Sequence, residues 1–83
     1  MARVKMYTTS VCPFCVQAKR LLHERGIPYD EVNVEDDDAL RMEMVKLAQG
    51  RRTVPQIFID DAPIGGYVEL RALADRGGLA NLP

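Results

Sequence analysis

The stretch Thr8-Thr9-Ser10-Val11-Cys12-Pro13-Phe14-Cys15-Val16 contains both cysteines of the chain and decides its fold. A short β-rich run precedes this stretch, and a helical pattern follows it. The helical pattern is a recurrence of small or apolar residues at spacings of four, three and four, namely Val11, Cys15, Ala18 and Leu22. Because the period changes from extended to helical, the sequence predicts that the cysteines lie at a strand-to-helix turn.

Pro13 indicates where the helix begins. Proline lacks an N–H group and has a φ angle that suits a helix, so it fits the first helical position and makes Cys12 the N-cap. The sulfur of Cys12 then faces the free amides of Phe14 and Cys15 at the positive end of the helix dipole, which favours a thiolate. Cys15 lies one turn later, within reach of a disulfide bond. The pattern predicts a redox site with an exposed Cys12 and a more buried Cys15.

The rest of the sequence limits the class of protein. Its 83 residues predict one domain, 1–83, with a modest core. Eleven basic and twelve acidic residues nearly balance, so nothing favours binding to nucleic acid or to a membrane. The first residues lack the apolar segment of a secretory signal. We therefore expect a cytoplasmic protein, in which a Cys-x-x-C pair is more often catalytic or metal-binding than structural.

The remaining pattern predicts an α/β protein with the order β-α-β-α-β-β-α. The acidic run 35–38 is expected to cap the second helix, and Leu79 and Leu82 are expected to tuck the chain end against the core. A helix joins the first two strands, so these strands should be parallel, and a tight turn joins the last two into a hairpin. A four-stranded mixed sheet with helices on both faces follows, and it resembles the thioredoxin fold. The strands are expected near 3–8, 29–34, 56–59 and 64, and the helices near 13–25, 39–49 and 67–76.

Three motifs resemble those of the glutaredoxin family, in particular its short bacterial dithiol members. They are Cys12-Pro13-Phe14-Cys15, Thr53-Val54-Pro55-Gln56-Ile57-Phe58-Ile59 and Gly65-Gly66, and the ending Arg76-Gly77-Gly78-Leu79 is also typical. The likeness covers nearly the whole chain from Val4 onward. It implies a monomeric oxidoreductase that reduces protein disulfides and glutathione mixed disulfides, with glutathione as co-substrate and no permanently bound cofactor or metal. Cys12 would attack, and Cys15 would resolve the mixed disulfide.

The resemblance also implies a glutathione site. It implies a cis Val54–Pro55 bond, pairing of the Val54 backbone with the cysteinyl unit, and a carboxylate held by the amides of Tyr67 and Val68 at a helix start. Arg51 and Arg52 either attract the other carboxylate or are a solvated pair at the end of the second helix. The implied glutathione-binding residues are Phe14, Arg51, Thr53, Val54, Pro55, Gly66, Tyr67 and Val68.

Three departures from the family pattern keep alternatives open. Phe14 replaces the usual Tyr, Thr9 replaces a frequent Lys, and Val68 replaces a polar residue that would cap the last helix and bind the ammonium group of glutathione. A redoxin recharged by a thioredoxin-type reductase is the first alternative. A second is a dimer that binds an iron–sulfur cluster through Cys12 and glutathione, although Cys15 is unusual for such relatives. A structural disulfide or half of a zinc site fits less well, because the loop is short and no second cysteine pair exists.

Overall fold

The computed structural model describes residues 3–80, and its helices and strands follow the predicted order. Each expected element is present, with bounds close to those read from the sequence. The elements are β1 (Val4–Thr8), α1 (Pro13–Glu24), β2 (Tyr29–Asn33), α2 (Asp38–Leu47), β3 (Gln56–Ile59), β4 (Ala62–Gly65) and α3 (Tyr67–Asp75).

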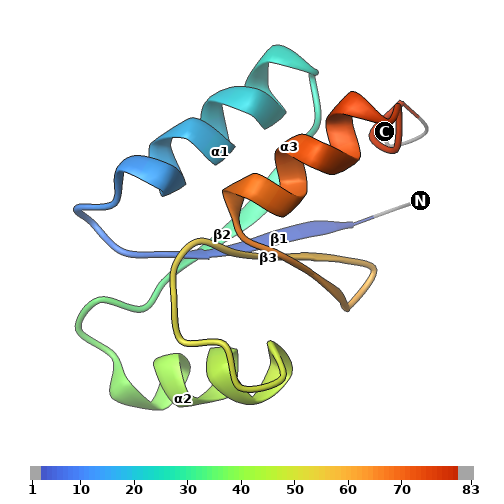
Figure 1. Cartoon of the computed structure of the whole chain (residues 1–83). Coiled ribbons are helices and arrows are strands. Elements are labelled where there is room, and N and C mark those ends of the chain that lie inside the picture. Colours follow the sequence, from blue (N-terminus) through green and yellow to red (C-terminus); the bar gives the residue numbers. More distant parts are fainter. Residues whose placement is uncertain (1–2, 81–83) are drawn as a thin grey trace.

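The four strands of the described chain form one mixed sheet in the order β2-β1-β3-β4. β1 pairs in parallel with β2 and antiparallel with β3, and β3 and β4 form the predicted hairpin. Figure 1 shows α1 and α3 on one face of the sheet and α2 on the other. This arrangement confirms the predicted thioredoxin-like architecture, and it places the end of β1 and the start of α1 at one edge of the sheet.

Alternation along β1 supplies a core to each face of the sheet. Met6 is buried on the side of α1 and α3, and Tyr7 is buried on the side of α2. The ring of Tyr7 meets that of Phe58 edge to face, with centroids 5.6 Å apart, an arrangement that aromatic pairs prefer. Two packed faces therefore fix β1, the strand that leads into the cysteine turn.

The acidic run before α2 caps this helix, and one face of the helix is buried. Asp37 is its N-cap and accepts a hydrogen bond from the Leu40 amide at 2.9 Å, which confirms that the acidic run caps the helix. Leu47 is 47% exposed, because the buried face of this helix centres on Met44 and Ala48 and leaves Leu47 at its margin. The helix also ends before Gly50.

Two further expectations concern residues at the margins of the described elements. Val11 was counted in the helical pattern, but it precedes the N-cap of α1 and its side chain is 87% exposed. Leu79 is buried in the core, as predicted. The expectation for Leu82 lies outside the described residues. Within residues 3–80, none of the helices has the length and apolar character needed to cross a bilayer.

Glu31 joins α1 to the sheet beside the cysteine turn. The Thr8 hydroxyl donates a hydrogen bond of 2.7 Å to its carboxylate, and the Lys19 ammonium lies 2.6 Å from the same oxygen. The bonds from Lys19 and then Thr8 lower the pKa of the Glu31 carboxyl, although burial opposes them. A carboxyl whose pKa is depressed by folding stabilises the fold at neutral pH and loses that contribution as pH falls through its folded pKa.

We predict that Glu31→Gln lowers the free energy of unfolding at pH 7 by no more than about 1 kcal/mol, because the ion pair is partly solvated. The difference from wild type should shrink as pH falls below the usual carboxyl range. Urea unfolding across pH measures this, with Glu43→Gln on the exposed face of α2 as the matched control. A difference independent of pH would contradict the electrostatic role of Glu31.

Candidate active site

Cys12 is the N-cap of α1, as the position of Pro13 predicted. Its backbone is extended, with φ −152° and ψ 98°, and Pro13 occupies the first helical position. Of the two amides predicted to face the sulfur, that of Cys15 makes the hydrogen bond, at 3.1 Å from the Cys12 Sγ. The sulfur therefore receives an N–H group at the positive end of the α1 dipole.

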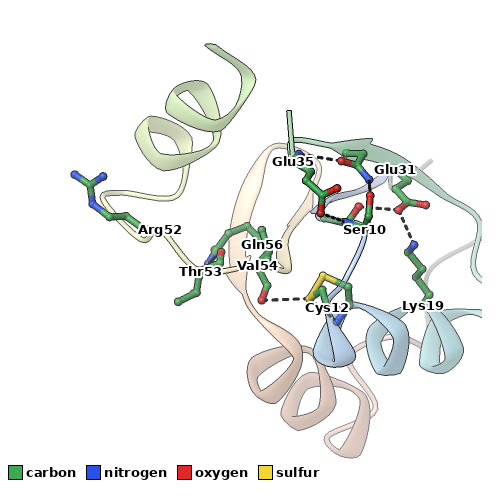
Figure 2. The surroundings of a disulfide bond; sticks show 12 residues. Ser10, Cys12, Lys19, Glu31, Glu35, Arg52, Thr53, Val54 and Gln56 are labelled. Atoms are coloured by element: carbon green, nitrogen blue, oxygen red, sulfur yellow. Dashed lines mark hydrogen bonds and ion pairs between the residues drawn. A yellow bond between two sulfur atoms is a disulfide. The ribbon is translucent and has the colours of Figure 1, made fainter. Parts of the chain in front are cut away.

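The two cysteines form a disulfide bond, with their Cα atoms 5.1 Å apart. Cys15 is buried, as expected, but Cys12 is only 8% exposed, which corrects the prediction of an exposed sulfur. Its Sγ turns inward and lies 3.7 Å from the carbonyl oxygen of Val54, which Figure 2 shows across the site. A loop far away in sequence therefore covers part of the sulfur.

The loop that contains Val54 is held by a buried polar side chain. Gln56 donates hydrogen bonds from Nε2 to the Thr53 carbonyl at 2.9 Å and to the Thr53 hydroxyl at 3.2 Å. Gln56 lies opposite Tyr7 in the β1–β3 pairing, so the loop is anchored to the central strand. The Val54–Pro55 peptide bond is cis, as the family resemblance implied. Sequence reasoning did not assign this role to Gln56.

A pocket of about 280 Å³ lies beside the cysteine pair and shares Val54 with it. It brings together all eight residues that the sequence assigned to a glutathione site, and it adds Glu69. Phe14 and Tyr67 stack at one side of it, with ring centroids 6.3 Å apart. The complete lining is Phe14, Arg51, Thr53, Val54, Pro55, Gly66, Tyr67, Val68 and Glu69.

Glu69 is the pocket residue that sequence reasoning missed. Its Oε1 accepts the Gly66 amide hydrogen at 2.7 Å and lies 3.0 Å from Arg51 Nη2. The Gly66 amide is the main cause of a lowered pKa of the Glu69 carboxyl, burial opposes it, and Arg51 adds to the lowering. The bond from the Gly66 amide to Glu69 is the half of a capping box that the third helical residue makes, and the other half is missing because glycine has no side chain.

The contacts of Glu69 explain two other features of the pocket. Arg51 lines the pocket and pairs there with Glu69, and its side chain is 48% exposed. Gly65 has φ +118°, and a Cβ atom there would collide with the side chains of Glu69 and Arg51.

Arg52 lies outside the pocket lining. Its carbonyl oxygen accepts a hydrogen bond from the Arg41 side chain, and its own side chain points away from the disulfide in Figure 2.

The N-cap of α3 is Gly66, so the expected cap at position 68 is wrong. Val68 is the second residue of the helix and is 68% exposed at the pocket. A polar side chain at this position faces the free amides of the first turn but does not cap them. It still interacts with the helix dipole.

Three features define the class of this protein: a mixed sheet, a cysteine pair at the start of α1, and a cis-proline loop against the first cysteine. Together they are those of a thiol–disulfide oxidoreductase of the thioredoxin fold. The chain belongs to the glutaredoxin family. The family described as Glutaredoxin matches residues 4–64. Within the described residues 3–80, no group of three or more His, Cys, Asp or Glu side chains is arranged to hold a metal ion.

Relatives and solved structures agree with this assignment. The chain is 49% identical to glutaredoxin 3 of Escherichia coli K12 over 79 residues, which cover 95% of this chain and 94% of that protein. It is 40% identical to glutaredoxin 1 of Francisella tularensis, solved with cacodylate, with a TM-score of 0.79 and coverage of 92% and 95%. A buckwheat glutaredoxin–glutathione complex shares the fold, with a TM-score of 0.85, 24% identity and coverage of 95% and 74%.

We predict that Val68→Asp stabilises the protein by about 0.3–1 kcal/mol, the range for a charge in the first turn of a helix. This gain is smaller than an N-cap would give, because Gly66 holds that position. Urea unfolding at low and high salt measures the effect, and Val68→Asn is the uncharged control. Equal stabilities of the two variants at low salt would contradict a dipole effect.

Proposed function

We propose that this protein is a dithiol glutaredoxin that uses glutathione to reduce protein disulfides and mixed disulfides of glutathione. One observation carries the proposal: a single pocket beside the cysteine pair is lined by all eight residues that family resemblance assigned to glutathione. The expected site of action is the cytoplasm, with the protein acting as a monomer on disulfide-bearing or glutathionylated client proteins.

Glutathione enters the pocket as a co-substrate. The Val54 backbone pairs with its cysteinyl unit, as an added strand pairs with a sheet edge. The first-turn amides of Tyr67 and Val68 have no partners within the helix, so they donate hydrogen bonds to the γ-glutamyl carboxylate. Arg51 attracts the other carboxylate while it remains beside Glu69. The buckwheat relative, solved with glutathione, supports this use of the fold.

On a glutathionylated client, the Cys12 thiolate attacks the glutathione sulfur. A Cys12–glutathione disulfide forms, the client–glutathione bond breaks, and the client sulfur leaves as a thiolate that takes up a proton. A second glutathione thiolate attacks the glutathione sulfur of this intermediate, which releases oxidised glutathione and restores Cys12. One free glutathione is therefore consumed per turnover, the other half of the oxidised glutathione comes from the client, and Cys15 is not required.

On a client protein disulfide, Cys12 first forms a mixed disulfide with one client sulfur and releases the other as a thiol. The Cys15 thiolate then attacks the Cys12 sulfur, releases the second client thiol and forms the Cys12–Cys15 bond. The short Cα separation of 5.1 Å accommodates that bond. Two glutathione molecules then reduce it and leave as oxidised glutathione.

A thioredoxin-type reductase remains the competing electron donor, and two site residues favour keeping it in the test. Val68 presents an apolar side chain to the pocket, and Thr9 precedes the cysteines where a lysine would add positive charge. Both reduce the polar contacts available to glutathione. An iron–sulfur dimer is the third possibility, and an anaerobic absorbance spectrum of the purified protein tests it.

We predict that Cys15→Ser retains removal of glutathione from a glutathionylated protein and loses reduction of those protein disulfides that need the second thiol. Cys12→Ser should lose both activities, because no attacking thiol remains. Steady-state assays with glutathione, glutathione reductase and NADPH measure both substrates.

The same assays with a thioredoxin-type reductase as sole donor provide the control. The proposal expects turnover with glutathione to exceed that with the reductase at least about tenfold, a difference of 1.4 kcal/mol in transition-state stabilisation. Equal loss in the two cysteine variants on the glutathionylated protein would contradict the one-thiol route. Turnover with the reductase but not with glutathione would show that the reductase, and not glutathione, is the electron donor.

A further inference from the structure

Gln56 is a buried polar side chain to which the proposed chemistry gives no part. It is the first residue of β3, and only 1% of it is exposed. A carboxamide in such a place needs hydrogen-bond partners within the protein, because burial without them is costly. Both bonds that its nitrogen donates go to one residue, Thr53, in the loop before β3. A buried side chain that serves a single loop residue indicates a task for that loop.

The two bonds from Gln56 orient the peptide unit between Thr53 and Val54. Nε2 lies 2.9 Å from the Thr53 carbonyl oxygen and 3.2 Å from the Thr53 hydroxyl, and an amide nitrogen carries a hydrogen for each. The Thr53 carbonyl and the Val54 amide belong to one planar peptide unit and point in opposite directions. Because the carbonyl is held toward Gln56, the Val54 amide is turned away from it.

Val54 is the residue at which the loop meets the redox site. Its carbonyl oxygen lies 3.7 Å from the Cys12 Sγ, and Figure 2 shows this contact with Thr53 and Gln56 beside it. Val54 also lines the pocket, where its backbone is the edge that glutathione pairs with in the proposed function. One loop residue therefore faces both the sulfur and the co-substrate.

The Val54 carbonyl and the Cys15 amide act on the Cys12 sulfur in opposite ways. The amide, 3.1 Å away, stabilises a thiolate. In the reduced protein, a neutral thiol donates its hydrogen to the carbonyl, whereas a thiolate faces the negative end of the carbonyl dipole. The carbonyl therefore favours the neutral thiol as long as the loop holds it at this place.

We propose that Gln56 is a positioning residue that fixes the Thr53–Val54 peptide, and that it thereby restrains the reactivity of Cys12 while it presents the edge for glutathione. The part that concerns glutathione rests on the proposed function, and the restraint on Cys12 does not. Loss of the Gln56 bonds then has two opposite effects: Cys12 ionises more readily, and glutathione binds more weakly. General loosening of the fold would instead bring Cys12 toward a free thiol, which ionises less readily.

The charged groups around Cys12 are held by bonds that do not involve Gln56. They are Glu35 on the Ser10 amide, the Lys19–Glu31 pair beside α1, and the Arg51–Glu69 pair at the pocket wall. The first turn of α1 is uncharged, and the Arg52 side chain points away from the disulfide. A neutral substitution of Gln56 leaves all these charges in place, so a change at Cys12 reports on the loop.

The test uses Gln56→Met, which keeps the length of the side chain and removes both N–H donors. In the reduced variant, the pH midpoint of Cys12 modification by iodoacetamide should move down by roughly 0.5 pH unit, since a weak hydrogen bond to the neutral thiol is lost. With the mixed disulfide of glutathione and 2-mercaptoethanol as substrate, KM for glutathione should rise about three- to tenfold, because binding must now order the loop. At saturating glutathione, kcat should stay within about twofold of wild type.

Ile57→Val is the matched control. Ile57 is the next residue of β3, is fully buried, and packs in the core on the other face of the sheet. This variant loosens the core without touching the loop, so the alkylation midpoint and KM should both keep their wild-type values. Gln56→Asn is a second test variant, because its amide is one methylene too short to reach Thr53. It should shift both quantities in the same directions as Gln56→Met.

A midpoint that stays or moves up in both Gln56 variants would overturn the restraint on Cys12, and an unchanged KM would overturn the role in glutathione binding. Equal shifts in Ile57→Val would reduce both effects to loosening of the core and would overturn the proposal as a whole. If the wild-type protein does not turn over with glutathione, the proposed function fails. The alkylation comparison then still decides whether Gln56 restrains Cys12.

Discussion

The hydrogen bond from the Cys15 amide to the Cys12 sulfur, at 3.1 Å, is the interaction on which the site depends. It exists because Pro13 starts α1 one residue after Cys12, so that the sulfur takes the place of a capping oxygen. The same arrangement puts positive potential at the atom that carries negative charge in the proposed exchange. This one contact therefore links the position of Pro13, the start of α1 and the proposed reactivity of Cys12.

The sheet brings the other parts of the site to that sulfur. β1 and β3 are neighbours, so the loop before β3 approaches the turn after β1 and puts Val54 beside Cys12. The start of α3 then closes the pocket from the other side, where Glu69 holds both Gly66 and Arg51. In the proposed mechanism the reacting groups are the chain's own two sulfurs, which the fold brings together.

The features that were predictable from sequence are local or carried by several motifs at once. Pro13 and the change of period gave the start of α1, and family resemblance gathered the pocket residues from three separate segments. The low exposure of Cys12 was not predictable, because it depends on Val54, which lies 42 residues away in the chain. Val11 was misplaced because helical spacing was extended through the cap, where the helical geometry no longer holds.

The pH dependence of alkylation of the reduced protein tests the central claim most directly. If the start of α1 stabilises the Cys12 thiolate, the pKa of this thiol lies below that of a free thiol, about 8.5. Iodoacetamide should then modify Cys12 before Cys15, at a rate that stays high below pH 7, with the modified residue identified by peptide mass mapping. Preferential modification of Cys15, or a Cys12 rate that rises only near the pKa of a free thiol, would contradict the account.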